Sequence, residues 1–180
     1  MVKRALFQQL VDAEKERPAP IPVRAVRPGG VIWLACLSVA DTKEIAEALK
    51  TRLHKDGFTA VVLINNELEG VFATKLDQDA TAPLAIARSQ GKLCQILAQQ
   101  GQMVICVNTT MRRQVFDWNR NALPNYMEVH LDGPTSKSVE GSQIIELPHK
   151  ADLHLSLTDD TSPAHICDAV EAKLEEILFV

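Results

Sequence analysis

The sequence predicts an α/β protein whose helices cover a doubly wound, mostly parallel β-sheet. Short apolar runs, each bounded by polar residues or glycine, alternate along the chain with segments whose apolar residues have helical spacing. The chain has 180 residues, which suffice for one domain with an apolar core. A hydrophobic content of 46% and a charged content of 23% are typical of a folded globular protein.

The N-terminal residues are set apart from the rest by their prolines. Val2 to Glu16 has the pattern of a short amphipathic helix. The segment that follows cannot continue a helix, because proline lacks an amide hydrogen and has a fixed φ; it contains Pro18, Pro20, Pro22 and Pro28. We therefore divide the chain into an N-terminal helix and Pro-rich linker over residues 1–28, and one domain over residues 29–180.

Five segments have the patterns of β-strands. Three are continuous apolar runs, which are typical of strands buried on both faces: Val31 to Leu37, Ala60 to Ile64 and Met103 to Val107. Tyr126 to Leu131 and Leu153 to Leu157 alternate apolar with polar residues, which predicts strands nearer the edge of the sheet.

Helices are predicted between and after these strands. The first begins near Asp41, and Asp41 with Glu44 has the form of a capping box. The apolar residues at helical spacing fall into three groups: Ile45, Leu49 and Leu53; Leu93, Ile96 and Leu97; and Ile166, Val170, Leu174, Ile177 and Leu178.

Charge and cysteine content exclude several classes of protein. Lys and Arg total 19 against 23 Asp and Glu, and the net charge of -4 has the wrong sign for neutralising nucleic-acid phosphates. No segment has the roughly 20 apolar residues of a membrane span. We expect a soluble, cytoplasmic protein that binds neither nucleic acid nor membranes. The cysteines are far apart and indicate neither disulfides nor a zinc site: Cys36, Cys94, Cys106 and Cys167.

Ordered segments of the chain resemble the adenylylsulfate kinases, P-loop enzymes that phosphorylate adenylyl sulfate at its 3′-hydroxyl. The matching segments are Val31–Leu34, Leu37–Ser38, Ile45–His54, Gly57–Phe58, Leu97–Gly101, Tyr126–Pro134 and Ala151–Leu155. The resemblance extends over nearly everything from Val31 to Leu178 and implies a P-loop kinase-like three-layer sandwich.

The residues that carry phosphate binding in that family are replaced here. A P-loop requires G-x-x-x-x-G-K-[ST], because glycines let backbone amides surround the phosphates, the lysine reaches them and the hydroxyl holds Mg²⁺. The corresponding segment is Cys36–Lys43, which lacks both glycines. Thr42 stands at the lysine position and Lys43 at the hydroxyl position. The remaining nucleotide-binding candidates are Ser38, Thr42 and Lys43.

The other motifs of the family are reduced as well. The family's D-G-D-N falls on Ile64–Glu67, and its arginines are retained only at Arg88 and Arg113. Pro134 to His149 stands in place of a long basic lid. The resemblance therefore implies four substrate-pocket candidates, Asn66, Glu67, Arg88 and Arg113.

His149, Asp152 and His154 lie close together in the sequence and are of residue types that bind metal ions. His149 and His154 differ by five positions, so on one strand they face opposite sides, whereas zinc needs convergent ligands. The sequence therefore predicts no metal site.

The sequence predicts a catalytically inactive adenylylsulfate kinase-like protein that acts as a binding or regulatory subunit, linked to sulfate activation. Its expected partners are an adenylyl or sulfate-containing anion and a protein, either a second copy or another chain. Two alternatives stay open. One is a non-standard kinase that uses ATP and Mg²⁺ through Ser38, Lys43 and Glu67. The other is a structural or oligomerisation partner that docks through its N-terminal helix.

Overall fold

A computed structural model describes residues 29–36, 39–64, 67–68, 82–109, 112–132, 151–158 and 161–178. The elements follow in this order: β1 (Gly30–Cys36), α2 (Val39–Lys55), β2 (Thr59–Ile64), α4 (Ala82–Gln99), β3 (Gln102–Asn108), α5 (Arg113–Ala122), β4 (Tyr126–Asp132), β5 (Leu153–Ser156) and α6 (Pro163–Leu178). The predicted helix from Val2 to Glu16 and the Pro-rich linker over residues 1–28 lie outside these ranges.

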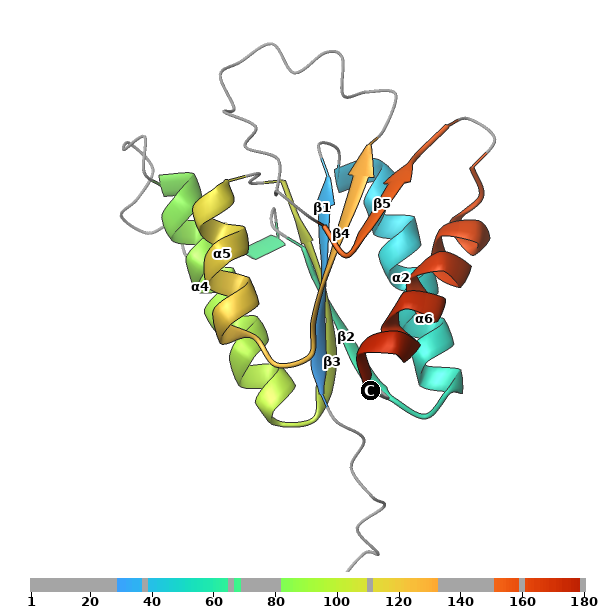
Figure 1. The fold of residues 1–180 in the computed structure, drawn as a ribbon, viewed down its shortest axis with the longest axis horizontal. Coiled ribbons are helices and arrows are strands. Elements are labelled where there is room, and N and C mark those ends of the chain that lie inside the picture. Colours follow the sequence, from blue (N-terminus) through green and yellow to red (C-terminus); the bar gives the residue numbers. More distant parts are fainter. Residues whose placement is uncertain are drawn as a thin grey trace, which may run out of the picture.

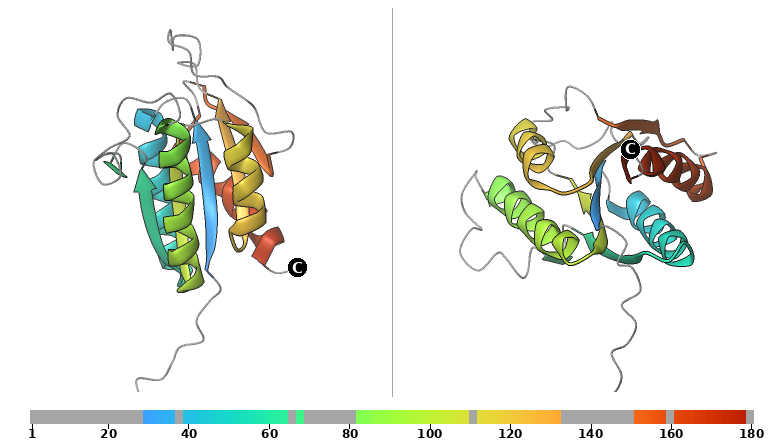
Figure 2. Two further views of the ribbon diagram at one scale, coloured as in Figure 1. Left: turned by 90° about the vertical axis from the view of Figure 1, so that its left-hand side faces the viewer. Right: turned by 60° about the horizontal axis from the view of Figure 1, so that its bottom comes forward.

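The described strands form one parallel sheet of five strands in the order β2-β3-β1-β4-β5. The order runs outward in both directions from β1, which makes the sheet doubly wound. Helices α2 and α6 cover one face, and α4 and α5 cover the other (Figures 1 and 2). The predicted three-layer α/β sandwich is confirmed, and all five predicted strands are present.

The central strand β1 is buried along its whole length, which explains its unbroken apolar sequence. Val31, Trp33 and Ala35 pack on the side of α4 and α5. The intervening residues Ile32 and Leu34 pack on the side of α2 and α6. Successive side chains of a strand point to opposite faces, so a strand covered on both faces must be apolar at every position.

β4 and β5 are the last two strands on one side of the sheet, as predicted, and β5 forms its edge. The polar residues Glu128 and His130 of β4 are nonetheless buried, because β4 pairs with both β1 and β5. Two other features differ from the expectation. Helix α5 was not predicted, since Val115 and Phe116 are adjacent and give no helical period. Helix α2 begins at Val39, so Asp41 lies inside its first turn and does not occupy the capping position.

Two glycines end helices at the lower edge of the sheet in Figure 1. Gly57 follows α2 and Gly101 follows α4, each with φ of 84°. Only glycine adopts this backbone conformation without steric cost, so both turns are tight and lead directly into the next strand. None of the described helices is long and apolar enough to cross a membrane.

Helix α4 packs closely on α5 at a glycine, and we expect Gly91→Ala to destabilise the fold. A Cβ at this position would lie 2.7 Å from the Trp118 ring and 2.9 Å from the Asn119 side-chain oxygen. Overpacking costs about 1 to 3 kcal/mol, and the higher helix propensity of alanine returns about 0.5 to 1 kcal/mol. Urea unfolding should therefore give a net loss of about 1 kcal/mol.

The matched control is Gln99→Ala on the exposed side of the same helix. Its free energy of unfolding should change by less than about 0.5 kcal/mol. An unchanged or increased stability of Gly91→Ala would show that α5 moves away without cost.

Candidate functional site

In an open parallel sheet, ligands bind beyond the carboxyl ends of the strands. This edge is the upper one in Figure 1, where the strand arrows point and where α2, α4 and α5 begin. The site residues predicted from the sequence are far apart along the chain. Those that the structure describes lie on elements that meet at this edge: Thr42, Lys43, Glu67, Arg88 and Arg113. Ser38 and Asn66 lie outside the described residues.

The first turns of α2 carry Thr42 and Lys43. Thr42 is completely buried. Lys43 is exposed, and its Nζ lies 3.1 Å from Oε1 of Glu67, in the segment that follows β2. The side chains of Lys43 and Glu67 are 57% and 61% exposed, so water screens the attraction between them. The structure thus joins two predicted site residues in one ion pair, which the sequence did not predict.

The two candidate arginines lie on the opposite face of the sheet. Arg88 is exposed in the second turn of α4. Arg113 is the first residue of α5, and its Nε lies 3.7 Å from Oδ2 of Asp117 on the same helix. Helices α4 and α5 are neighbours, so both arginines stand near the edge at which ligands bind (Figure 1).

A buried pair of amides at the end of β3 was missed from the sequence. Asn108 Nδ2 donates a hydrogen bond to Gln90 Oε1 at 2.6 Å, and Gln90 Nε2 donates to the Val107 carbonyl at 3.3 Å. Both side chains are almost completely buried. Buried amides need such partners, so these contacts fix α4 to the carboxyl end of β3. Eighteen positions separate the two residues, and neither belongs to a recognisable motif.

Midway along β4, a buried carboxylate holds together three elements. Arg120 of α5 contacts Glu128 Oε2 at 3.1 Å and Asp152 Oδ1 at 3.3 Å, and the Glu128 amide donates to Asp152 Oδ2 at 2.8 Å. The Tyr126 hydroxyl donates to Glu128 Oε2 at 3.3 Å. Burial raises the pKa of Glu128, and the charge of Arg120 opposes that shift. Asp152, which the sequence suggested as a metal-ligand candidate, is therefore engaged by Arg120.

We expect Arg120→Ala to destabilise the protein by about 2 kcal/mol at pH 7.5. Removing one partner of a buried ion pair costs about 3 to 5 kcal/mol, and the 45% exposure of the Arg120 side chain reduces that cost. Without Arg120 the pKa of Glu128 should rise further. Below that pKa the Glu128 carboxyl group is neutral and needs no cation. The loss of stability caused by Arg120→Ala should therefore become smaller as the pH falls from 7.5 to 5.

Urea unfolding at the two pH values measures this change. The control is Lys50→Ala, which breaks only the exposed contact with Glu47 and should cost less than about 0.5 kcal/mol at both pH values. A loss of equal size at pH 5 and pH 7.5 in Arg120→Ala would rule out Glu128 as the titrating group.

At the carboxyl end of the same strand, two histidines share one carboxylate. His130 Nε2 lies 3.3 Å from Asp132 Oδ1, and His154 Nε2 lies 2.6 Å from Asp132 Oδ2. The two imidazole rings are stacked, with centroids 4.7 Å apart. Burial lowers the pKa of His130, against the opposing charge of Asp132. The sequence set His154 beside His149, which lies outside the described residues, and missed His130 as its neighbour.

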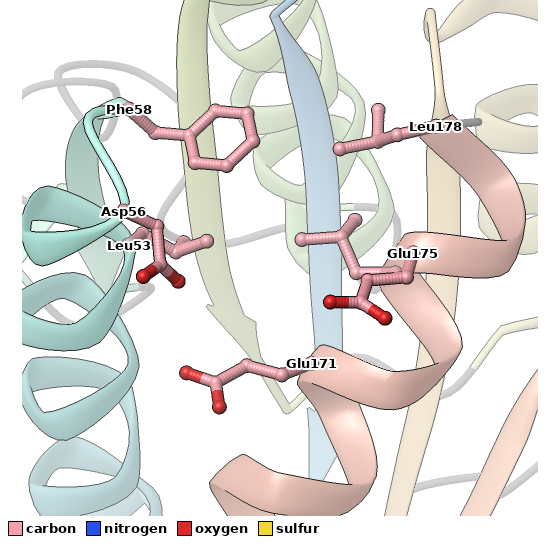
Figure 3. A pocket seen from close by; sticks show the side chains of 7 residues that line it. Leu53, Asp56, Phe58, Glu171, Glu175 and Leu178 are labelled. Atoms are coloured by element: carbon pink, nitrogen blue, oxygen red, sulfur yellow. The ribbon is translucent and has the colours of Figure 1, made fainter.

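A hollow of about 350 Å³ lies at the other end of the sheet. Phe58 and Leu53 point into it from the α2–β2 side, and Leu178 and Glu175 point into it from α6 (Figure 3). Asp56 and Glu171 also line it, so three carboxylates surround this space. Such a lining repels phosphate and sulfate, and the position is remote from the edge at which parallel sheets bind ligands. It is not the predicted anion site.

Comparison with known proteins identifies the family. The model for adenylylsulphate kinase matches residues 28–152, which is more than half of the chain. The chain belongs to the adenylylsulphate kinase family. Members of this family are phosphotransferases, and the family resemblance stated from the sequence is confirmed.

One curated relative of this adenylylsulphate kinase family member is the cytidine diphosphoramidate kinase of Campylobacter jejuni. It is 26% identical over 113 residues, which are 63% of this chain and 66% of the relative. The match thus spans just under two thirds of the relative's length. This relative is a kinase named for a different substrate.

Solved structures share the fold. The Mycobacterium tuberculosis APS kinase in complex with AMPPNP and APS has a TM-score of 0.69 at 18% identity, covering 82% of this chain and 98% of its own. The hexameric APS kinase from Thiobacillus denitrificans has a TM-score of 0.68 at 19% identity, covering 95% of this chain and 33% of its own. At these identities the likeness establishes the fold alone.

Proposed function

We propose that this member of the adenylylsulphate kinase family has lost phosphoryl transfer and acts as a binding or regulatory subunit. One observation carries the proposal: the position at which a P-loop needs its lysine holds a completely buried threonine, Thr42. The next residue, Lys43, has its ammonium group paired with the Glu67 carboxylate.

Phosphoryl transfer depends almost entirely on positioning the phosphates and stabilising their charge. A buried threonine supplies no positive charge to a phosphate. Lys43 could contact a phosphate only next to the Glu67 carboxylate with which it pairs. That carboxylate repels any phosphate that replaces it as the partner of Lys43. At 4 Å two such charges repel by about 1 kcal/mol in water and about 4 kcal/mol near a protein surface. A single charged hydrogen bond contributes about 1.5 to 3 kcal/mol, so the gain from Lys43 is largely cancelled.

The surviving positive charges favour a ligand on the other side of this edge. Arg88 and Arg113 are exposed on adjacent helices, and the family resemblance implies that they correspond to substrate-side arginines. A guanidinium group suits planar or tetrahedral oxyanions, because it offers several donors in a fixed geometry. We therefore propose that this subunit retains an adenylyl or sulfate-containing anion as its ligand.

The alternative is a kinase that acts on another substrate. Two observations favour it: the curated relative is a kinase for a cytidine diphosphoramidate, and Glu67 offers an exposed carboxylate at the binding edge. In that case Lys43 and Glu67 would have altered roles toward ATP and Mg²⁺. Nucleotide binding separates the two functions directly.

Titration calorimetry with ATP and Mg²⁺ should give no saturable binding in the low micromolar range. The physical reason is the absence of a positive charge at Thr42 and the pairing of Lys43 with Glu67. Lys43→Ala should behave as the wild type does. Binding near 1 μM, which corresponds to about -8 kcal/mol, would contradict the proposal. Loss of that binding in Lys43→Ala would then establish the kinase alternative.

Adenylyl sulfate should raise the melting temperature of the wild type but not that of an Arg88→Ala, Arg113→Ala double variant. These substitutions remove both candidate arginines, whose side chains are exposed, without touching the core. The matched control is Lys50→Ala with Lys55→Ala, which removes the same charge at the far end of α2 and should keep the full shift. Equal shifts in both double variants would refute the assignment of the two arginines.

A further inference from the structure

The carboxyl end of β4 and the neighbouring residues of β5 bring together three side chains whose chemistry suits a metal ion. His130 and His154 are direct neighbours in the register of the two strands, and Asp132 ends β4 two residues after His130. One ligand atom from each residue lies within 4.8 Å of the others. The alternating direction of side chains along a strand puts His130 and Asp132 on the same face of the sheet.

One spacing between these donor atoms, that of His130 and Asp132, already equals the spacing of ligands in a tetrahedral zinc site. Metal–ligand bonds of about 2.0 to 2.1 Å separate neighbouring ligand atoms by about 3.3 Å. His130 Nε2 and Asp132 Oδ1 are already 3.3 Å apart. His154 is held 2.6 Å from the other oxygen of Asp132, as a direct hydrogen bond. Its side chain is 56% exposed, so the ring can tilt toward a shared ion without displacing core residues.

Burial divides the three ligands into a fixed part and an accessible part. The His130 side chain is only 5% exposed, so its ring is held in position by its surroundings. Asp132 and His154 are 44% and 56% exposed, which leaves a path for an ion and room for further ligands. A preorganised ligand beside an open coordination position is the arrangement found in sites that bind water or substrate.

The charges of the cluster also favour a divalent cation. Two neutral imidazoles and one carboxylate carry a single negative charge in total. Protonating both stacked rings would instead place two positive charges 4.7 Å apart with one carboxylate between them. A divalent ion satisfies both imidazole nitrogens and the carboxylate together, and imidazole is a preferred ligand of zinc and its neighbours in the first transition row.

We propose that His130, Asp132 and His154 form a binding site for one divalent transition metal ion, with zinc as the ion that fits best. The coordination positions of the ion that these three residues leave open would take water or an anionic group of a ligand. The site lies one strand away from the end of β1, since His130 is level with Ala35. It is independent of Arg88 and Arg113 and does not require nucleotide binding.

Calorimetric titration of the metal-free full chain with zinc chloride tests the site. The wild type should bind one zinc ion per chain with saturation at micromolar concentration. His154→Ala and Asp132→Asn should each weaken that binding at least tenfold, because each removes one of three ligands. Both substitutions are at partly exposed side chains, and thermal unfolding verifies that the variants fold. Cobalt offers a second readout, since ligation by these groups should give visible absorption that the variants lack.

His165→Ala is the matched control, because it removes an exposed histidine from α6 without touching the cluster. Its zinc affinity should equal that of the wild type. The proposal is overturned if the wild type shows no saturable binding or if either cluster variant loses less than tenfold. It is also overturned if His165→Ala weakens binding as much as the cluster variants do.

Discussion

The burial of β1 on both faces is the constraint on which the rest of the molecule depends. Every residue of this strand is buried, and hydrogen bonds pair it with β3 on one side and β4 on the other. A parallel strand in this position can be satisfied only by helices on both faces of the sheet. The loops that lead to those helices begin at the carboxyl ends of the strands, so the same constraint brings the starts of α2, α4 and α5 to one edge.

Polar residues within the sheet are tolerated where another element supplies a partner. β4 carries Glu128, His130 and Asp132 on the face toward α5, and three side chains from outside the strand contact them. Arg120 and Asp152 hold Glu128 in the middle of the strand, whereas His154 from the edge strand meets His130 and Asp132 at its end. The first cluster is closed and holds elements together. The second is open to solvent, and this difference in exposure separates a structural role from the proposed ligand-binding one.

The carboxyl edge of the sheet combines the family's fold with the residues on which the proposed loss of phosphoryl transfer rests. The chain belongs to the adenylylsulphate kinase family, and at the start of α2 Thr42 is buried while Lys43 pairs with Glu67. A buried side chain at this point contributes to the stability of the domain and supplies no charge to a phosphate.

The sequence by itself determined the strands and the parallel sheet, because apolar runs and helical spacing are local patterns that burial imposes. The family was recognised from the resemblance of ordered segments between Val31 and Leu178, and the family model confirms it. Helix α5, the burial of Glu128 and His130 on β4, and the side-chain pairs that join different elements at the carboxyl edge of the sheet were decided by tertiary structure. Lys43 meets Glu67 across 24 positions, and His154 meets Asp132 across 22. Such partners are set by strand order and register, and these depend on how the whole sheet buries its two faces rather than on any local pattern.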